Sequence, residues 1–166
     1  MIDTNAFRGR PILITGAAGC IGAWVVKLLS EFGAMPIVFD VSEDRHRLEL
    51  IMEKRESIIW ELGDITDFNR LEKVAEKYDV EAIIHLAALQ VPFCKTDPIN
   101  STKINVLGSI NILELARQRG ISRLSYASSI AAQAMGDNEW LATLYGAHIL
   151  CTELLALVFW HVWGLP

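Results

Sequence analysis

An apolar run that passes directly into a glycine-spaced turn is the feature of this sequence that most constrains its fold. Residues 12–14 are apolar and β-branched-rich, and Gly16, Gly19 and Gly22 follow at intervals of three as a helical pattern begins. Glycines permit a tight turn and close backbone approach, and a helix N-terminus offers unpaired N–H groups to a phosphate. The spacing differs from Gly-x-Gly-x-x-Gly, and glycine also serves ordinary strand-to-helix turns, so the loop alone leaves a purely structural role open.

Apolar runs and helical patterns continue to alternate along the chain. Strands are expected at residues 12–14, 37–39, 58–62, 82–86 and 124–127, several of them apolar at successive positions. Helices are expected at residues 21–32, 43–56, 68–78, 97–120 and 143–163. Such alternation indicates an α/β fold, with a parallel sheet buried on both faces by crossover helices. We find no internal repeat or linker, so the sequence predicts one domain over residues 1–166.

The composition excludes several classes of partner. The formal charge is −5, which offers no cationic surface for nucleic acid. The longest uninterrupted apolar stretch, residues 154–160, is too short to cross a bilayer, and no basic segment leads an apolar core at the N-terminus. Three widely spaced cysteines, Cys20, Cys94 and Cys151, suggest reduced, buried thiols. We therefore expect a cytoplasmic protein without a membrane, nucleic-acid or metal partner.

Polar residues follow several of the expected strands. Asp40 ends the second strand, 18 residues after Gly22, Asp64 follows the third, and His85 ends the fourth. The carboxyl ends of parallel strands share one edge of a sheet, and ligands bind at that edge. A carboxylate in the position of Asp40 can accept hydrogen bonds from an adenosine ribose, whereas His85 is expected to be a hydrogen-bonded core residue.

Together these motifs resemble the extended short-chain dehydrogenase/reductases, specifically the NAD-dependent nucleotide-sugar epimerases and dehydratases, from about residue 10 to the end of the chain. The resemblance implies a Rossmann-like doubly wound sheet, which we expect in the order 3-2-1-4-5, with NAD as cofactor. It implies cofactor contacts from Gly16, Ala18, Gly19, Cys20, Ile21 and Gly22 at the pyrophosphate, from Asp40 at the ribose, from Asp64 and Ile65 at the adenine, and from Leu86, Ala87 and Ala88 along the fourth strand. It also makes Asn105 a structural residue.

The resemblance implies a catalytic serine after the fifth strand and a Tyr-x-x-x-Lys motif on the next helix. Ser129 and Tyr145 match the serine and the tyrosine, which would also lie against the cofactor, but Ile149 occupies the lysine position. An unperturbed phenol is ionised in only about one molecule in a thousand at neutral pH, and an ammonium nearby would favour the ionised form. Isoleucine cannot supply that charge, so we expect weak catalysis.

Two further departures concern the substrate. Only 15 residues separate Ser129 from Tyr145, and the chain stops where the resembled family enters a sixth strand and a C-terminal substrate domain. We therefore expect a shortened form of an NAD-dependent epimerase/dehydratase-type oxidoreductase acting on a sugar, in particular a nucleotide-linked one. The alternative is a non-catalytic NAD-binding or interaction module, and the sequence leaves open whether the chain is an active enzyme.

Two properties of the assembled protein can also be predicted. Asp40 would repel a 2′-phosphate, so NAD should bind more tightly than NADP, with Arg45 and Arg47 as the nearby cations. The last helix is more widely apolar than one contact with a sheet requires. Relatives commonly pair through the corresponding helices, so we expect a homodimer through residues 104–116 and 143–163.

Overall fold

A computed structural model describes residues 4–53, 58–133 and 141–165. Its parallel sheet has the order β3-β2-β1-β4-β5, which confirms the predicted topology. The strands are β1 (Pro11–Thr15), β2 (Met35–Asp40), β3 (Ile59–Leu62), β4 (Ala82–His85) and β5 (Arg123–Tyr126). The helical elements are η1 (Thr4–Phe7), α1 (Cys20–Glu31), α2 (His46–Ile51), α3 (Phe68–Lys77), α4 (Val91–Thr96), α5 (Pro98–Thr102), η2 (Lys103–Gly108), α6 (Ser109–Arg119), η3 (Ile130–Ala132) and α7 (Leu144–Trp163).

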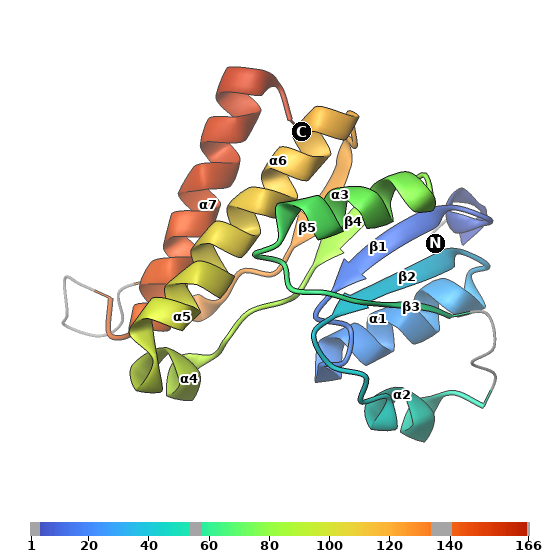
Figure 1. Cartoon of the computed structure of the whole chain (residues 1–166), viewed down its shortest axis with the longest axis horizontal. Helices are drawn as coiled ribbons and strands as arrows, with labels where there is room; N and C mark the ends of the chain where they lie inside the picture. Colours follow the sequence, from blue (N-terminus) through green and yellow to red (C-terminus); the bar gives the residue numbers. More distant parts are fainter. Residues whose placement is uncertain (1–3, 54–57, 134–140, 166) are drawn as a thin grey trace.

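Helices cover both faces of the sheet. In Figure 1, α1 and α2 lie on one side of the strands, whereas α3 and α6 lie on the other with α7 beside α6. Side chains alternate along β1, so Ile14 packs toward Val26 of α1 while Leu13 packs toward Leu71 of α3. Both β1 side chains are fully buried, which stabilises the fold by about 2 kcal/mol each. The sheet is therefore closed on both faces at its centre, as the continuous apolar runs indicate.

Edge strand β3 carries a charged residue that faces inward. Glu61 is 8% exposed, and its carboxylate accepts hydrogen bonds from Arg70 (2.6 Å), Lys77 (2.7 Å) and the hydroxyl of Tyr78. Burial alone would raise the pKa of this carboxyl, but the three hydrogen bonds outweigh it and lower the pKa to about 2. Glu61 thereby ties β3 to both ends of α3.

The helix expected over residues 43–56 is wrong in extent. Helix α2 covers only His46–Ile51, and residues 54–57 lie outside the described part of the chain. The Ser42 hydroxyl accepts a hydrogen bond from the Asp44 N–H at 3.0 Å, and the Asp44 carboxylate accepts one from the His46 N–H at 3.0 Å. Short polar side chains satisfy the backbone here in a non-helical conformation, which delays the start of the helix.

The helix expected over residues 97–120 forms with an interruption. It begins at the cap Asp97 and ends at Gly120, whose φ of 66° is the left-handed conformation expected of a C-terminal glycine. Between α5 and α6, however, η2 is a stretch of π-helix that includes Asn105. Helix α4, which ends just before α5, was not predicted from the sequence.

Helix α7 is the longest helix in the described chain. It begins after Thr143, whose hydroxyl caps the Gly146 N–H at 3.0 Å, and it packs against α6, α4, η2 and η3. Six large apolar side chains on its second half are about half exposed: Leu154, Leu157, Val158, Trp160, Val162 and Trp163. With 20 residues and a mean hydropathy of 1.3, α7 is long and apolar enough to cross a membrane. The sequence did not suggest this, because its longest uninterrupted apolar stretch, residues 154–160, is too short to do so.

Candidate functional site

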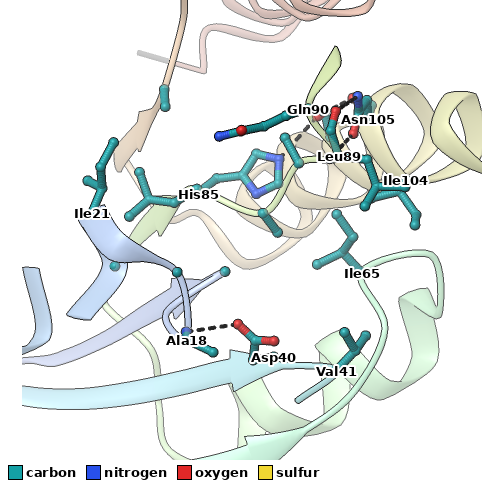
Figure 2. Close-up of a pocket in the computed structure, with 18 of the residues that line it drawn as sticks. Ala18, Ile21, Asp40, Val41, Ile65, His85, Leu89, Gln90, Ile104 and Asn105 are labelled. Atoms are coloured by element: carbon teal, nitrogen blue, oxygen red, sulfur yellow. Dashed lines mark hydrogen bonds between the residues drawn. The ribbon is translucent and has the colours of Figure 1, made fainter. Parts of the chain in front are cut away.

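A cavity of about 790 Å³ opens at the carboxyl edge of the sheet. All the predicted site residues line it: Gly16, Ala18, Gly19, Cys20, Ile21, Gly22, Asp40, Asp64, Ile65, Leu86, Ala87, Ala88, Ser129 and Tyr145. Figure 2 shows that it runs between the loop after β1, the end of β2 and the loop after β4. The topology therefore brings together residues that are more than a hundred positions apart in the sequence.

The loop after β1 needs glycine for two separate reasons. A Cβ on Gly16 would lie 2.6 Å from the backbone nitrogen of Ala87, and the residue has φ of 70°. A Cβ on Gly22 would lie 2.5 Å from the Cα of Ala17, so the first turn of α1 packs directly on the loop. These close approaches leave the N-terminus of α1 open to the cavity. Cys20 is exposed there and Cys151 is partly exposed, so the predicted burial is wrong for both, whereas Cys94 is buried as expected.

Asp40 joins the end of β2 to this loop. Its Oδ2 accepts a hydrogen bond from the Ala18 N–H at 3.0 Å, as the dashed line in Figure 2 shows, and its Oδ1 accepts one from the Ser42 N–H at 3.0 Å. Each carboxylate oxygen has a second lone pair free to accept a ligand hydroxyl. The Arg47 guanidinium also reaches the loop, donating to the Ala18 carbonyl at 3.2 Å.

Beneath the cavity floor, His85 connects β1 to α6. The Ser109 hydroxyl donates its hydrogen to the Asn105 carbonyl (2.6 Å). The Ser109 oxygen therefore accepts from Nε2–H of His85 (3.1 Å). Nδ1 of His85 then accepts from the Thr15 hydroxyl (2.7 Å), whose oxygen accepts backbone N–H groups at the start of the β4–α4 loop. Burial lowers the pKa of His85 to about 4. The prediction of a buried, hydrogen-bonded histidine is confirmed, although its ring also borders the cavity.

Asn105 braces the β4–α4 loop from the π-helical turn. Its Oδ1 accepts from the Leu89 N–H at 2.7 Å, and its Nδ2 donates to the Leu89 carbonyl at 2.8 Å and to Nδ1 of His148 at 3.3 Å. Figure 2 shows the paired bonds to Leu89. His148 is buried, which lowers its pKa, and its Nε2 donates to the Thr102 hydroxyl oxygen at 3.0 Å. His148 is thus engaged with neighbouring protein groups, and no cluster of three or more potential metal ligands occurs among the described residues.

The opposite end of the cavity is formed by β5, the segment after it and α7. Ser129 caps η3, with its Oγ accepting from the Ala131 N–H at 3.2 Å, so its own O–H remains available to a ligand. Tyr145 lines the cavity one helical turn before Ile149, which is 6% exposed. Arg47 is the single lysine or arginine among the described lining residues, and it belongs to the other end.

Several contributors to the cavity were missed in the sequence. The Ser128 hydroxyl, which lines the cavity, donates to the carboxylate of Glu153 on α7. Burial, together with the charge of Glu153, raises the pKa of Tyr126, which also lines the cavity. Phe93 of α4, the helix that was not predicted, and Gln90, which precedes that helix, also line the cavity. The 25-residue separation between Ser128 and Glu153 gave no local pattern to recognise.

Comparison with known proteins decides which family carries this site. The model of the NAD dependent epimerase/dehydratase family matches residues 12–148. The chain belongs to this family. Its glycine loop, Asp40, Ser129 and Tyr145 all fall within the matched residues.

Individual members of the family share the same region. A UDP-glucose 4-epimerase of Rhizobium leguminosarum is 34% identical over 131 residues, covering 76% of this chain and 38% of that protein. The structure of an L-threonine dehydrogenase from Clostridium difficile has a TM-score of 0.80 at 32% identity, covering 95% of this chain and 51% of the other. A UDP-glucose 4-epimerase from Brucella ovis, in complex with NAD, has a TM-score of 0.83 at 27% identity, covering 95% and 50%. The chain thus spans about half the length of these relatives, or less.

NAD is the cofactor of this family, and the residues of this chain fit it. A Cβ on Gly16 or Gly22 would collide with neighbouring backbone atoms, so only glycine permits the close packing of this loop. That packing leaves the N-terminus of α1 open, and a pyrophosphate binds well at a helix N-terminus. The free lone pairs of Asp40 suit the two hydroxyls of a ribose. NAD supplies a carbon that accepts a hydride and returns it.

Proposed function

We propose that this chain is the cofactor-binding portion of an NAD-dependent oxidoreductase of the epimerase/dehydratase type, whose substrate is a nucleotide-linked sugar. The observation that carries the proposal is the shared cavity. The glycine loop and Asp40 line one end of it, and Ser129 and Tyr145 line the other. UDP-glucose 4-epimerases among the relatives support the substrate class.

In this proposal the residues of each end have distinct tasks. The loop from Gly16 to Gly22 binds the pyrophosphate and Asp40 binds the adenosine ribose, with Asp64 and Ile65 against the adenine. Leu86, Ala87 and Ala88 leave room for the cofactor along β4. Tyr145 takes the proton of a sugar hydroxyl while the hydride leaves the adjoining carbon, and it returns the proton when the hydride comes back. Ser129 donates its free hydroxyl hydrogen to the reacting oxygen.

Ile149 limits how well Tyr145 performs this task. An ammonium at this position would stabilise the phenolate by Coulomb attraction, whereas the buried isoleucine makes the cavity wall apolar. Weakened general-base catalysis lowers the rate by roughly a hundredfold to a thousandfold. The same observation favours a second candidate function, an NAD-binding or interaction module without turnover.

Turnover distinguishes the two candidates. We expect NAD to bind the unmodified chain in titration calorimetry. With nucleotide sugars as substrates, formation of the epimerised or dehydrated sugar nucleotide should be slow in the unmodified chain, faster in Ile149→Lys and absent in Ile149→Lys/Tyr145→Phe. If NAD binds but Ile149→Lys remains inactive, the binding-module function is correct. Strong activity of the unmodified chain that survives Tyr145→Phe would show that another residue is the base.

The exposed side of α7 supports a further proposal about assembly. We infer a homodimer through α6 and α7, since six large apolar side chains on α7 are about half exposed in the single chain. A second copy of the chain would cover these side chains, and we propose a cytoplasmic location for the resulting dimer. Light scattering at tens of micromolar should give twice the mass of the 18.5 kDa chain. A stable monomer would contradict the proposed interface.

A further inference from the structure

Glu153 brings a negative charge to the end of the cavity that is lined by Tyr145. The lining of this end, from Tyr126 to Ser129 and along α7, contains no lysine, arginine, aspartate or glutamate among the described residues. Glu153 lies directly behind that lining, because its carboxylate accepts a hydrogen bond from the hydroxyl of Ser128, which is part of it. One hydrogen bond therefore separates the carboxylate from the cavity surface.

The helical spacing of α7 also places Glu153 on the side that borders the cavity. Tyr145, Ile149 and Glu153 follow one another at intervals of four residues, so each lies beside the next on the surface of the helix. Tyr145 and Ile149 line the cavity, and Glu153 is the next member of the same row. The carboxylate therefore belongs to the wall at which Tyr145 acts in the proposed function.

No cation pairs with Glu153 within the described part of the chain. The ion pairs between described residues involve other acidic groups, namely Glu31, Asp44, Glu61, Glu81 and Glu114. The position one turn before Glu153, from which a basic side chain could pair with it, is occupied by Ile149. Arg47 lines the cavity, but at its adenosine end. The charge of Glu153 thus acts on this end of the cavity without a compensating charge beside it.

Tyr126 shows that this charge reaches the cavity lining. Burial raises the pKa of the Tyr126 phenol, and the charge of Glu153 raises it further, because a nearby anion disfavours the phenolate. Tyr126 itself lines the cavity. A positively charged group in the same space would be favoured for the reason that the phenolate is disfavoured.

We propose that Glu153 is a specificity-determining residue for the oxidation state of the cofactor, so that NAD⁺ binds this chain more tightly than NADH. The nicotinamide ring of NAD⁺ is positively charged and becomes neutral when it accepts a hydride. The remainder of the cofactor is the same in both forms, so a carboxylate at this end favours the oxidised one. The proposal rests on the proposed function, in which the hydride is transferred at the end lined by Tyr145.

Titration calorimetry with NAD⁺ and NADH tests the proposal on the full chain without any turnover. Glu153→Gln keeps an oxygen that accepts from Ser128 and removes the charge, and we expect it to weaken NAD⁺ about fivefold while changing NADH less than about twofold. Glu76→Gln is the matched control, because Glu76 is exposed on α3 outside the cavity lining and its replacement changes the net charge equally. It should leave the ratio of the two affinities unchanged.

Tyr126 provides a second measurement that needs no cofactor. Its pKa, followed by the ultraviolet absorbance of the phenolate and assigned with Tyr126→Phe, should fall in Glu153→Gln and stay unchanged in Glu76→Gln. A Tyr126 pKa that does not fall would contradict the proposal, because the charge of Glu153 would then not reach the lining.

Two outcomes of the calorimetry would also overturn the proposal. Equal weakening of NAD⁺ and NADH by Glu153→Gln would reduce Glu153 to a support of the cavity wall, and no weakening of either would show that solvent screens its charge. In both cases NAD would still bind the unmodified chain, so the proposed function would stand. If the unmodified chain bound neither form, the proposed function would be contradicted and this proposal with it.

Discussion

The two ends of the cavity differ in the charged and hydrogen-bonding side chains that line them. At the adenosine end, the backbone of the glycine loop, the Asp40 carboxylate and the Arg47 guanidinium are bonded to one another and still have acceptor or donor capacity for a ligand. At the other end, Tyr145 and the buried Ile149 line the cavity, and no lysine or arginine among the described lining residues lies beside them. In the proposed function, cofactor binding and substrate chemistry depend on different ends, so variants should be able to separate them.

The largest effect should come from the glycine loop. In Gly22→Ala the new Cβ meets backbone atoms of Ala17 and Gly16 at 2.5 Å, so the loop must shift away from the helix N-terminus. We expect NAD affinity to fall at least a hundredfold, or about 3 kcal/mol. Gly120→Ala is the control, since its Cβ has nothing within 4 Å, and it should bind NAD normally despite the strain of its positive φ. Unchanged affinity in Gly22→Ala would contradict a tightly packed loop.

A smaller effect is expected from the loss of Asn105, which braces the β4–α4 loop. Asn105→Ala removes the bonds to the N–H and C=O of Leu89 and to Nδ1 of His148, although Cys94 Sγ still contacts the carbonyl (3.1 Å) and Nδ1 (4.0 Å), so the free energy of unfolding should fall by about 2 kcal/mol. Asn111→Ala removes a single bond, to the Ile65 carbonyl, and should cost about 1 kcal/mol. Denaturant titration of the two variants makes the comparison. Equal losses would show that the bonds to Leu89 contribute little.

His85, which lies between the two ends, should give a pH effect. Its pKa is about 4 in the folded protein and near 6.5 when unfolded, so the unfolded chain binds more protons between these values. Stability is therefore fully present above pH 6.5 and is lost as the pH falls toward 4, by about 2 kcal/mol at pH 5. His85→Asn should flatten the dependence of unfolding free energy on pH in this window. The slope would persist in that variant if His148 or the carboxylates were responsible.

The sequence was sufficient for those parts of the site that depend on local pattern. Gly16, Gly19 and Gly22 occur at intervals of three in the loop and at the start of the next helix, and Asp40 ends an apolar strand, so each could be recognised from its neighbours. Because the carboxyl ends of parallel strands share one edge of the sheet, the predicted topology was enough to place these residues together. The same reasoning placed the starts of two helices at residues 68 and 143, and the structure begins α3 at Phe68 and α7 at Leu144, after the caps Asp67 and Thr143.

What the sequence did not reveal depends on contacts between distant residues. The hydrogen bond from Ser128 to Glu153 and the pairing of Asn105 with Leu89 arise only once α7 and η2 pack beside the β4–α4 loop. The π-helical turn at η2 has no residue pattern that separates it from an ordinary helix. Helix α4 was missed because Pro92, at its start, reads equally well as a loop residue.

Glu61 has a consequence for the behaviour of the protein at high concentration. Strand β3 pairs only with β2 among the described residues, so a strand of another chain could add to its other side, where the Leu62 carbonyl already accepts from Arg70 Nε at 3.0 Å. An inward-facing charge on such an edge opposes that addition, and here the carboxylate is already fully engaged by Arg70, Lys77 and Tyr78. A foreign strand would have to disrupt this charged cluster in order to pack its own side chains there. The outer edge at β3 is thereby protected against the growth of intermolecular β-sheet.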